Sequence, residues 1–299
     1  MSILPRLMNG PLGPEDADLI NKIHAMPAAQ YHSDKTAISQ GALQEIERSP
    51  LHFITQWAKP YRDEDGTGDM LIGSLVHEAL LEPDVYAARI MIPKFGDQRF
   101  KENKEKKAKW KEENPIPEGA KIIEEADKRQ VENMCMAALS NKEIRDMLAA
   151  KETRKEATIY WVDESSFILN RARIDAITPD AIFDIKTLAN ASPSEVAKAI
   201  ANFGYDFQAA HYCAAGDALG RGVYSDYRFI AIEREEPFGC KVYRLKHSDL
   251  ARAHARRVNA QNRLRDCIDA RRWECYGDDV EEITLPGWHT GAKIEVEAF

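Results

Sequence analysis

Two aspartates and a lysine stand in an otherwise apolar stretch, RARIDAITPDAIFDIKTL, at residues 171–188. Buried strands seldom contain such charges unless the charges are paired or bind an ion. If the chain turns at Pro179–Asp180, an antiparallel hairpin places Asp175 opposite Asp184. Lys186 then projects to the same strand face as Asp184, because side chains alternate with a period of two. The spacing therefore predicts two carboxylates and one ammonium group at one point.

Two carboxylates this close raise each other's pKa unless a cation lies between them. Oxygen ligands with room for water suit Mg²⁺ or Mn²⁺, which lowers the pKa of bound water and stabilises charge developing on a phosphate. A neighbouring lysine can position or activate the attacking water, or stabilise the transition state. The residues thus indicate a phosphodiesterase site. Spacing alone leaves open a structural ion pair, such as Asp184 with Arg173, and a one-residue shift of register would separate the set.

The elements that position these residues follow from hydrophobic periodicity. Residues 1–95 are mostly helical in pattern, 96–130 form a polar insert rich in lysine, and 131–299 contain the strands, all within one domain. The insert is either a solvated helix or loop, or an arm that contacts phosphates. Strands are predicted over 156–162, 166–177, 181–188, 224–235 and 239–247, with two helices before the fourth strand and an arginine-rich helix at roughly 248–273. This order predicts an α/β or α+β core in which helices flank a mixed central sheet.

Composition limits the classes of function. The 299 residues are 44% hydrophobic and 30% charged, as in a soluble globular protein with a large core. No apolar run approaches the ~20 residues that span a bilayer and no signal peptide begins the sequence, so we expect a cytoplasmic protein without membrane contact. The five cysteines are scattered and form no C-x-x-C pair, so we expect no disulfide framework, zinc site or iron–sulfur cluster. The formal net charge of −8 means that any nucleic acid must bind at a local positive patch.

Five separate stretches resemble the RecE-like (exonuclease VIII) nuclease domain of phages and prophages, a member of the PD-(D/E)XK superfamily. They are YHSDKTAISQGALQEIERSPLHF, IGSLVHEALLEP, RARIDAI, FDIKTLANASPSEVAKAIANFGYDFQAAHYC and ITLPGW, and they span residues 31 to 288. The resemblance implies a restriction-endonuclease-like core preceded by a helical N-terminal region.

The resemblance also implies roles for individual residues. Asp175 and Asp184 correspond to two metal-binding carboxylates, and Lys186 corresponds to the catalytic lysine. His77 ends a G-x-x-x-H motif that matches the place of a metal-ligating histidine, whereas alone it would suit a helix surface or a satisfied core position. The backbone carbonyl of Ile185 is expected to be an additional ligand.

Further candidates lie on two helices. Gln208 and Tyr212 match a family Q-x-x-x-Y motif and share a helix face, from which they are expected to hydrogen-bond the catalytic groups or a DNA phosphate. Without the family, a capped helix with an interfacial tyrosine is the simpler interpretation. Glu78 follows His77 but points about 100° away from it around the helix, so it is a reserve candidate.

DNA contacts are expected from arginines. Arg171 and Arg173 share the strand face of Asp175 by parity, and more arginines crowd the late helix: Arg252, Arg256, Arg257, Arg263 and Arg265. Structural salt bridging is an equal alternative for each of them.

The implied function is a Mg²⁺- or Mn²⁺-dependent exonuclease. It would degrade one strand of linear double-stranded DNA from the 5′ end and leave a 3′ tail for a single-strand annealing protein of the RecT-like kind. The resemblance also implies a homo-oligomer, possibly a ring-shaped tetramer, that threads the duplex. Two other functions remain open, a structure- or sequence-specific endonuclease on the same core and a non-catalytic module that binds DNA ends.

Overall fold

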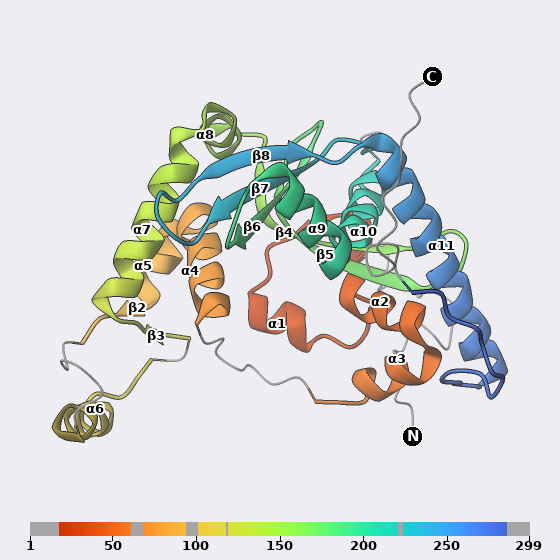
Figure 1. The fold of residues 1–299 in the computed structure, drawn as a ribbon, viewed down its shortest axis with the longest axis horizontal. Helices are drawn as coiled ribbons and strands as arrows, with labels where there is room; N and C mark the ends of the chain where they lie inside the picture. The colour runs from red at the N-terminus through yellow and green to blue at the C-terminus, as the bar shows by residue number, and fades with distance from the viewer. Residues whose placement is uncertain (1–17, 61–67, 94–100, 118, 221–223, 286–299) are drawn as a thin grey trace.

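A six-stranded mixed sheet forms the centre of the molecule in a computed structural model of the chain (Figure 1). The structure describes residues 18–60, 68–93, 101–117, 119–220 and 224–285. The strands in their order across the sheet are β1 (Ile23–His24), β4 (Arg154–Val162), β5 (Leu169–Ile177), β6 (Ile182–Leu188), β7 (Tyr227–Glu233) and β8 (Cys240–Arg244). Each long predicted strand is present; β4 begins two residues earlier than predicted, and the other four are slightly shorter than predicted.

Pairing between strands follows the connections. Strands β4, β5 and β6 form an antiparallel meander, as expected for short turns. Strand β7 runs parallel to β6 because two helices, α9 (Pro193–Phe203) and α10 (Tyr205–Asp217), make the crossover between them. Strand β8 returns antiparallel to β7. The predicted mixed central sheet flanked by helices is confirmed.

The helices cover both faces of the sheet (Figure 1). On one face, α4 (Asp69–Leu81), α7 (Glu125–Ser140) and α8 (Lys142–Ala149) pack against β6 and β7 through one apolar cluster. On the other face, α10 and α11 (His247–Ala270) bury a second cluster. Burial of this apolar surface on both sides supplies most of the driving force for folding.

The N-terminal helices form a third packing unit. Helices α1 (Ala28–Ser33), α2 (Gln40–Arg48) and α3 (Pro50–Trp57) precede α4, and a cluster built on α2 and α3 packs against α11. Helix α4 ends at Leu81, and Pro83 begins α5 (Pro83–Arg89), as the restricted backbone of proline favours at a helix start.

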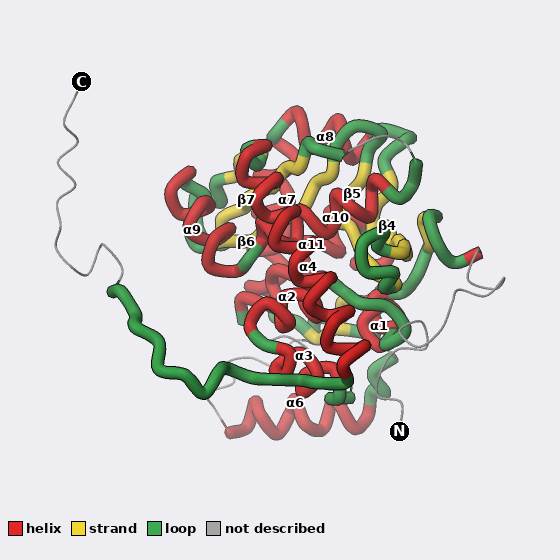
Figure 2. The backbone as a smooth tube through the Cα atoms, turned by 90° about the vertical axis from the view of Figure 1, so that its right-hand side faces the viewer, coloured by secondary structure: helices red, strands yellow, loops and turns green. Residues whose placement is uncertain are grey.

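The polar insert contains α6 (Lys101–Glu113), which stands apart from the body of the molecule (Figures 1 and 2). A small parallel pair, β2 (Ile90–Met91) with β3 (Lys121–Ile122), joins it to the body. Three of its lysines form ion pairs within the helix: Lys101 with Glu105, Lys106 with Glu102 and Lys109 with Glu113. These i, i+4 pairs are typical of a solvated helix. Among the described residues, no helix is long and apolar enough to cross a membrane.

Candidate metal centre and active site

The β5–β6 hairpin closes with a four-residue turn. Thr178 N–H donates to the Ala181 carbonyl over 2.9 Å. Ile177 pairs with Ile182, and the next pair outward keeps the same register. The turn is therefore centred at Pro179–Asp180, where the sequence predicts it.

The backbone ladder of this hairpin ends at the pair of Ala176 and Phe183, one step before the two aspartates would face each other. There the Asp175 carboxylate takes the place of a backbone acceptor, because its Oδ2 accepts a hydrogen bond of 2.7 Å from Ile185 N–H. The Asp175 side chain thus reaches across to β6. The observed pairs follow the predicted register but stop before Asp175 and Asp184, and Asp175 instead contacts the backbone of Ile185.

Lys186 lies beside Asp184, as the period of a strand predicts. Its Nζ is 2.7 Å from Asp184 Oδ2 and donates to Gln208 Oε1 over 3.1 Å. Gln208 in turn donates from Nε2 to Asp184 Oδ1 over 3.2 Å. The ring of Tyr205 lies 4.3 Å from the Lys186 ammonium group, which is a cation–π contact. One glutamine therefore fixes both the carboxylate and the ammonium group.

Helix α4 brings His77 to the site through a close approach to β6. A Cβ at Gly73 would lie only 2.9 Å from Thr187 Oγ1, so glycine is what allows the helix to lie so near the strand. One turn later, His77 Nδ1 lies 3.3 Å from Asp175 Oδ2. Burial lowers the pKa of His77, and the charge of Lys186 lowers it further. The imidazole is therefore neutral at pH 7 and keeps a lone pair for a metal.

The structure adds a residue that the sequence analysis did not select, Glu156. One side-chain ligand atom from each of His77, Glu156 and Asp175 lies within 4.8 Å of the others. The β4–β5 pairs on either side place Glu156 opposite Asp175. The predicted strands, 156–162 and 166–177, do not give this register, so spacing alone did not select Glu156. Tyr205 was also missed, although it precedes Gln208 by three residues and shares its helix face.

The carboxyl groups of this site resist ionisation. Burial raises the pKa of Asp184 to about 6, with the charge of Asp175 adding to the effect of burial. Burial and the charge of Asp175 raise the pKa of Glu156 to about 7, and burial raises the pKa of Asp175 as well. Asp184 Oδ2 is buried, and its partner among the described residues is the Lys186 ammonium group at 2.7 Å. A site with this excess of carboxylate oxygen, plus a neutral imidazole, fits a divalent cation.

Two predicted residues occupy places next to this centre rather than in it. Tyr212 shares a hydrogen bond with Gln208, and burial raises its pKa well above the ordinary value. Glu78, the reserve candidate, forms an ion pair with Arg89 of α5 and does not join the cluster. Its direction away from His77 agrees with the helical spacing.

The predicted DNA-binding arginines of β5 are enclosed by the protein. Arg171 is 4% exposed, donates to the carbonyl of Tyr31 and lies 4.6 Å from the ring of the same residue. Arg173 pairs with Glu156 over 2.6 Å and donates to the Met26 carbonyl. Tyr31 and Met26 therefore cover the face of β5 on which Arg171 and Arg173 were expected to contact DNA.

The arginines of α11 also have partners within the chain, although Arg252 and Arg256 are exposed. Arg257 forms a buried ion pair of 2.8 Å with Asp163, and Arg256 pairs with Glu47 and Asp206 over 2.9 Å each. Arg263 donates to the Ile46 carbonyl, Arg265 donates to the Ser166 carbonyl and Arg252 pairs with Asp249. Each of these arginines thus has a partner within the chain, and of the five Arg257 is the one whose side chain is fully buried in its ion pair.

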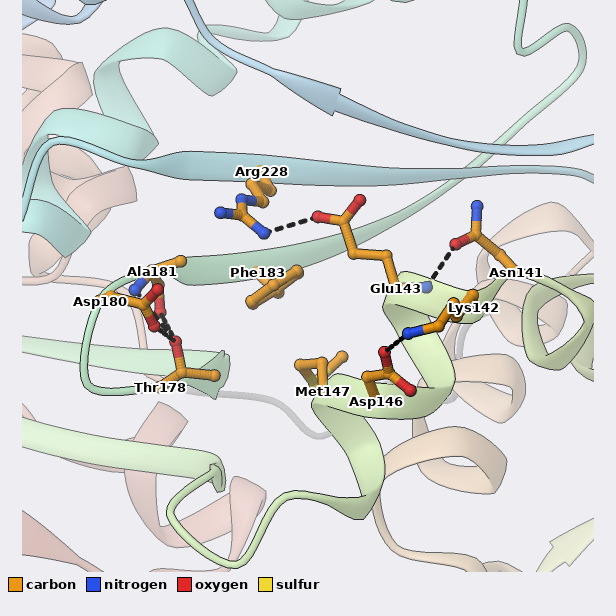
Figure 3. Close-up of a pocket in the computed structure, with 10 residues that line it drawn as sticks. All are labelled: Asn141, Lys142, Glu143, Asp146, Met147, Thr178, Asp180, Ala181, Phe183 and Arg228. Atoms are coloured by element: carbon orange, nitrogen blue, oxygen red, sulfur yellow. Dashed lines mark hydrogen bonds and ion pairs between the residues drawn. The ribbon is translucent and has the colours of Figure 1, made fainter.

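A pocket of about 560 Å³ lies between α8 and the β5–β6 turn (Figure 3). None of the predicted site residues is among those that line it. Its charged side chains pair with one another, Arg228 with Glu143 over 2.6 Å and Lys142 with Asp146 (Figure 3). The pocket is separate from the metal centre.

A family described as a PDDEXK-like domain of unknown function (DUF3799) matches residues 39–285. Among solved structures, a candidate exonuclease from Eubacterium rectale is 14% identical, with a TM-score of 0.56 over 91% of this chain and 100% of that chain. The structure of SSO0001 is 12% identical and covers 67% of this chain and 89% of that one, with a TM-score of only 0.25. No curated protein matches the chain significantly. Because the family match covers most of the chain and the first structural match shows the same fold, the chain belongs to this PDDEXK-like family, within the PD-(D/E)XK nuclease superfamily.

Proposed function

We propose that the protein is a divalent-metal-dependent, RecE-like exonuclease that acts on linear double-stranded DNA. The observation that carries the proposal is the meeting of His77, Asp175, Asp184 and Lys186 at the point where the β5–β6 ladder ends. The likeness to a candidate exonuclease supports exonuclease over endonuclease activity.

The chemistry of the site agrees with phosphodiester hydrolysis. A divalent cation would supply Lewis acidity and a bound water of lowered pKa. Burial alone would lower the pKa of Lys186, but the charges of Asp184 and Asp175 outweigh it and the pKa is raised. Lys186 is therefore an ammonium group, which can orient the attacking water or stabilise negative charge on the phosphate but cannot accept a proton. Gln208 and the ring of Tyr205 hold it in place.

The finer parts of the proposal come from the resemblance to RecE-like nucleases. The enzyme would degrade one strand in the 5′ to 3′ direction and leave a 3′ tail for a RecT-like annealing protein. A chain of net charge −8 that moves along DNA needs an enclosed path lined by its positive groups, which favours a ring-shaped homo-oligomer such as a tetramer.

Incubation of the protein with linear and covalently closed circular duplexes of the same sequence tests the proposal. We expect Mg²⁺ or Mn²⁺ to support degradation of the linear duplex only, EDTA to abolish it and Ca²⁺ to bind without turnover. Cleavage of the closed circle would favour the endonuclease, and binding of ends without any cleavage would favour the non-catalytic module. Undiminished cleavage in excess chelator would eliminate the metal site.

The oligomer is tested by sedimentation and by the salt dependence of DNA binding. We expect an assembly larger than a monomer and an affinity that falls steeply between low and physiological salt. An active monomer at micromolar concentration would contradict the ring.

A further inference from the structure

Glu156 has a backbone conformation that is unusual for its place in the sheet. It lies within β4, between residues that pair regularly with β5, yet its φ is +49°. L-amino acids other than glycine rarely adopt this left-handed region, and a residue held there inside a strand is strained. Such strain persists only where the surrounding structure imposes it, and it is concentrated at functional sites.

The Glu156 side chain is held at the metal centre by an arginine. Arg173 Nε donates to Glu156 Oε2 over 2.6 Å, and the two side chains are 11% and 17% exposed. The same arginine donates to the Met26 carbonyl, so its guanidinium group is fixed from a second side. The Glu156 carboxylate is thereby kept within reach of His77 and Asp175.

We infer that Glu156 is a further side-chain ligand of the divalent cation, added to the predicted ligands His77, Asp175 and Asp184, and that Arg173 positions its carboxylate. The inference rests on the metal dependence of the proposed function. Carboxylate oxygens and one imidazole nitrogen would hold a divalent cation and leave room for water and for a substrate phosphate.

The alternative is that Glu156 serves only to neutralise Arg173. A second acid, Glu82, already approaches Arg173 at 3.9 Å from outside any strand, and its side chain is 40% exposed. An ion pair of this kind requires no left-handed residue within a strand. Neutralisation of Arg173 therefore does not account for the left-handed backbone of Glu156, whereas a place among His77 and Asp175 agrees with it.

Binding of Mn²⁺ to the full chain, measured by titration calorimetry without DNA, tests the inference. We expect Glu156→Gln to weaken Mn²⁺ binding by about 10-fold or more, since a ligand contributes at least as much as an outer-shell partner. Glu82→Gln is the matched control, because it removes the other acid beside Arg173, and its affinity should stay within about twofold of wild type. Arg173→Gln should weaken binding less than Glu156→Gln does.

A second variant, Glu156→Gly, removes the carboxylate and suits the left-handed backbone. It should therefore keep the thermal stability of the metal-free protein while losing Mn²⁺ affinity as Glu156→Gln does. Wild-type affinity in both Glu156 variants would overturn the inference alone. An equal loss in Arg173→Gln would assign the effect to the ion pair and would also overturn it. If wild-type protein bound no Mn²⁺, the proposed metal-dependent function would fail as well.

Discussion

Two buried aspartates, Asp163 and Asp184, differ in how their charges are satisfied. The side chains are 5% and 1% exposed. Asp163 Oδ1 accepts hydrogen bonds from the backbone and hydroxyl groups of Ser165 and Ser166, and Oδ2 accepts one of 2.8 Å from Arg257. Asp184 has one hydrogen bond from Gln208 and an ion pair with Lys186.

The pKa values of the two carboxyl groups shift in opposite directions. Burial alone would raise both, but the Ser165 hydrogen bond and the Arg257 charge lower the pKa of Asp163 below its ordinary value. The pKa of Asp184 rises to about 6 because burial outweighs Lys186 and Asp175 adds repulsion. Burial of an aspartate therefore does not identify a functional site. Asp184 differs from Asp163 because its partners do not fully compensate its negative charge, so its pKa is raised.

The largest effect is expected on stability when Asp163, whose charge is fully paired, is replaced. Asp163→Ala leaves the Arg257 guanidinium group buried without its anion, so the free energy of unfolding should fall by about 3–5 kcal/mol. Urea denaturation followed by circular dichroism measures it. Asp269→Ala, which removes an exposed acid 3.5 Å from Arg265, is the control and should change stability by less than about 1 kcal/mol. A loss as small as that of the control would mean that Asp163 and Arg257 contribute little to stability.

Substitutions around Asp184 should change the rate of DNA degradation. Lys186→Ala should reduce degradation of linear duplex by about 10²-fold or more, because it removes a positioned charge from the transition state. Metal binding should remain, whereas Asp184→Ala should lose metal affinity and be partly rescued by added Mn²⁺. Initial rates and Mn²⁺ titrations separate the two steps. Lys198→Ala, at an exposed lysine of α9, is the control, and a wild-type rate in Lys186→Ala would make Lys186 a structural ion-pair partner.

A smaller effect is expected where α4 approaches β6. Gly73→Ala places a methyl group against Thr187 Oγ1, so α4 must shift and the unfolding free energy should fall by about 1–3 kcal/mol. Mn²⁺ affinity should fall too, since His77 moves with the helix. Gly41→Ala on α2 has open space and should stabilise the protein by up to about 1 kcal/mol. Thermal melts with and without Mn²⁺ compare them, and equal behaviour of the two variants would argue against a steric role for Gly73.

The last expected effect is a dependence of stability on pH in the metal-free protein. Native Asp184 keeps its proton up to about pH 6, whereas the unfolded group releases it near 3.8, so the native state binds more protons in this interval. The free energy of unfolding should therefore fall as pH rises from about 4 to 6. Asp163 acts oppositely and loses its contribution as pH falls below its ordinary pKa. In thermal melts with EDTA, the free energy of unfolding of Asp184→Asn should fall less between about pH 4 and 6 than that of wild type. An unchanged pH dependence would show that Asp184 is not its source.

The local part of the site could be predicted from the sequence because it depends on one hairpin. A turn at Pro179–Asp180 and the period of a strand bring Asp175, Asp184 and Lys186 together without any distant contact. His77 needed the family motif, since its place depends on how a helix packs on the sheet.

Other features depend on interactions that spacing does not encode. Parity placed Arg171 on a strand face correctly, but whether that face is open depends on Tyr31, about 140 residues earlier in the chain. The arginines of α11 look like a basic surface in sequence, although partners such as Asp163 and Glu47 come from other elements. Glu156 was missed because the predicted strand limits do not give the register that places it opposite Asp175.

The hydrogen bond from Ile185 N–H to Asp175 gives one side chain two separable duties. An alanine at this position would delete a ligand and also leave a backbone donor without an acceptor, so an inactive Asp175→Ala protein would not reveal which loss caused the defect. Asp175→Asn keeps an oxygen that can accept from Ile185 while it removes the negative charge. Loss of activity in a normally folded Asp175→Asn protein would therefore show that the negative charge of Asp175 is required in addition to its hydrogen bond with Ile185.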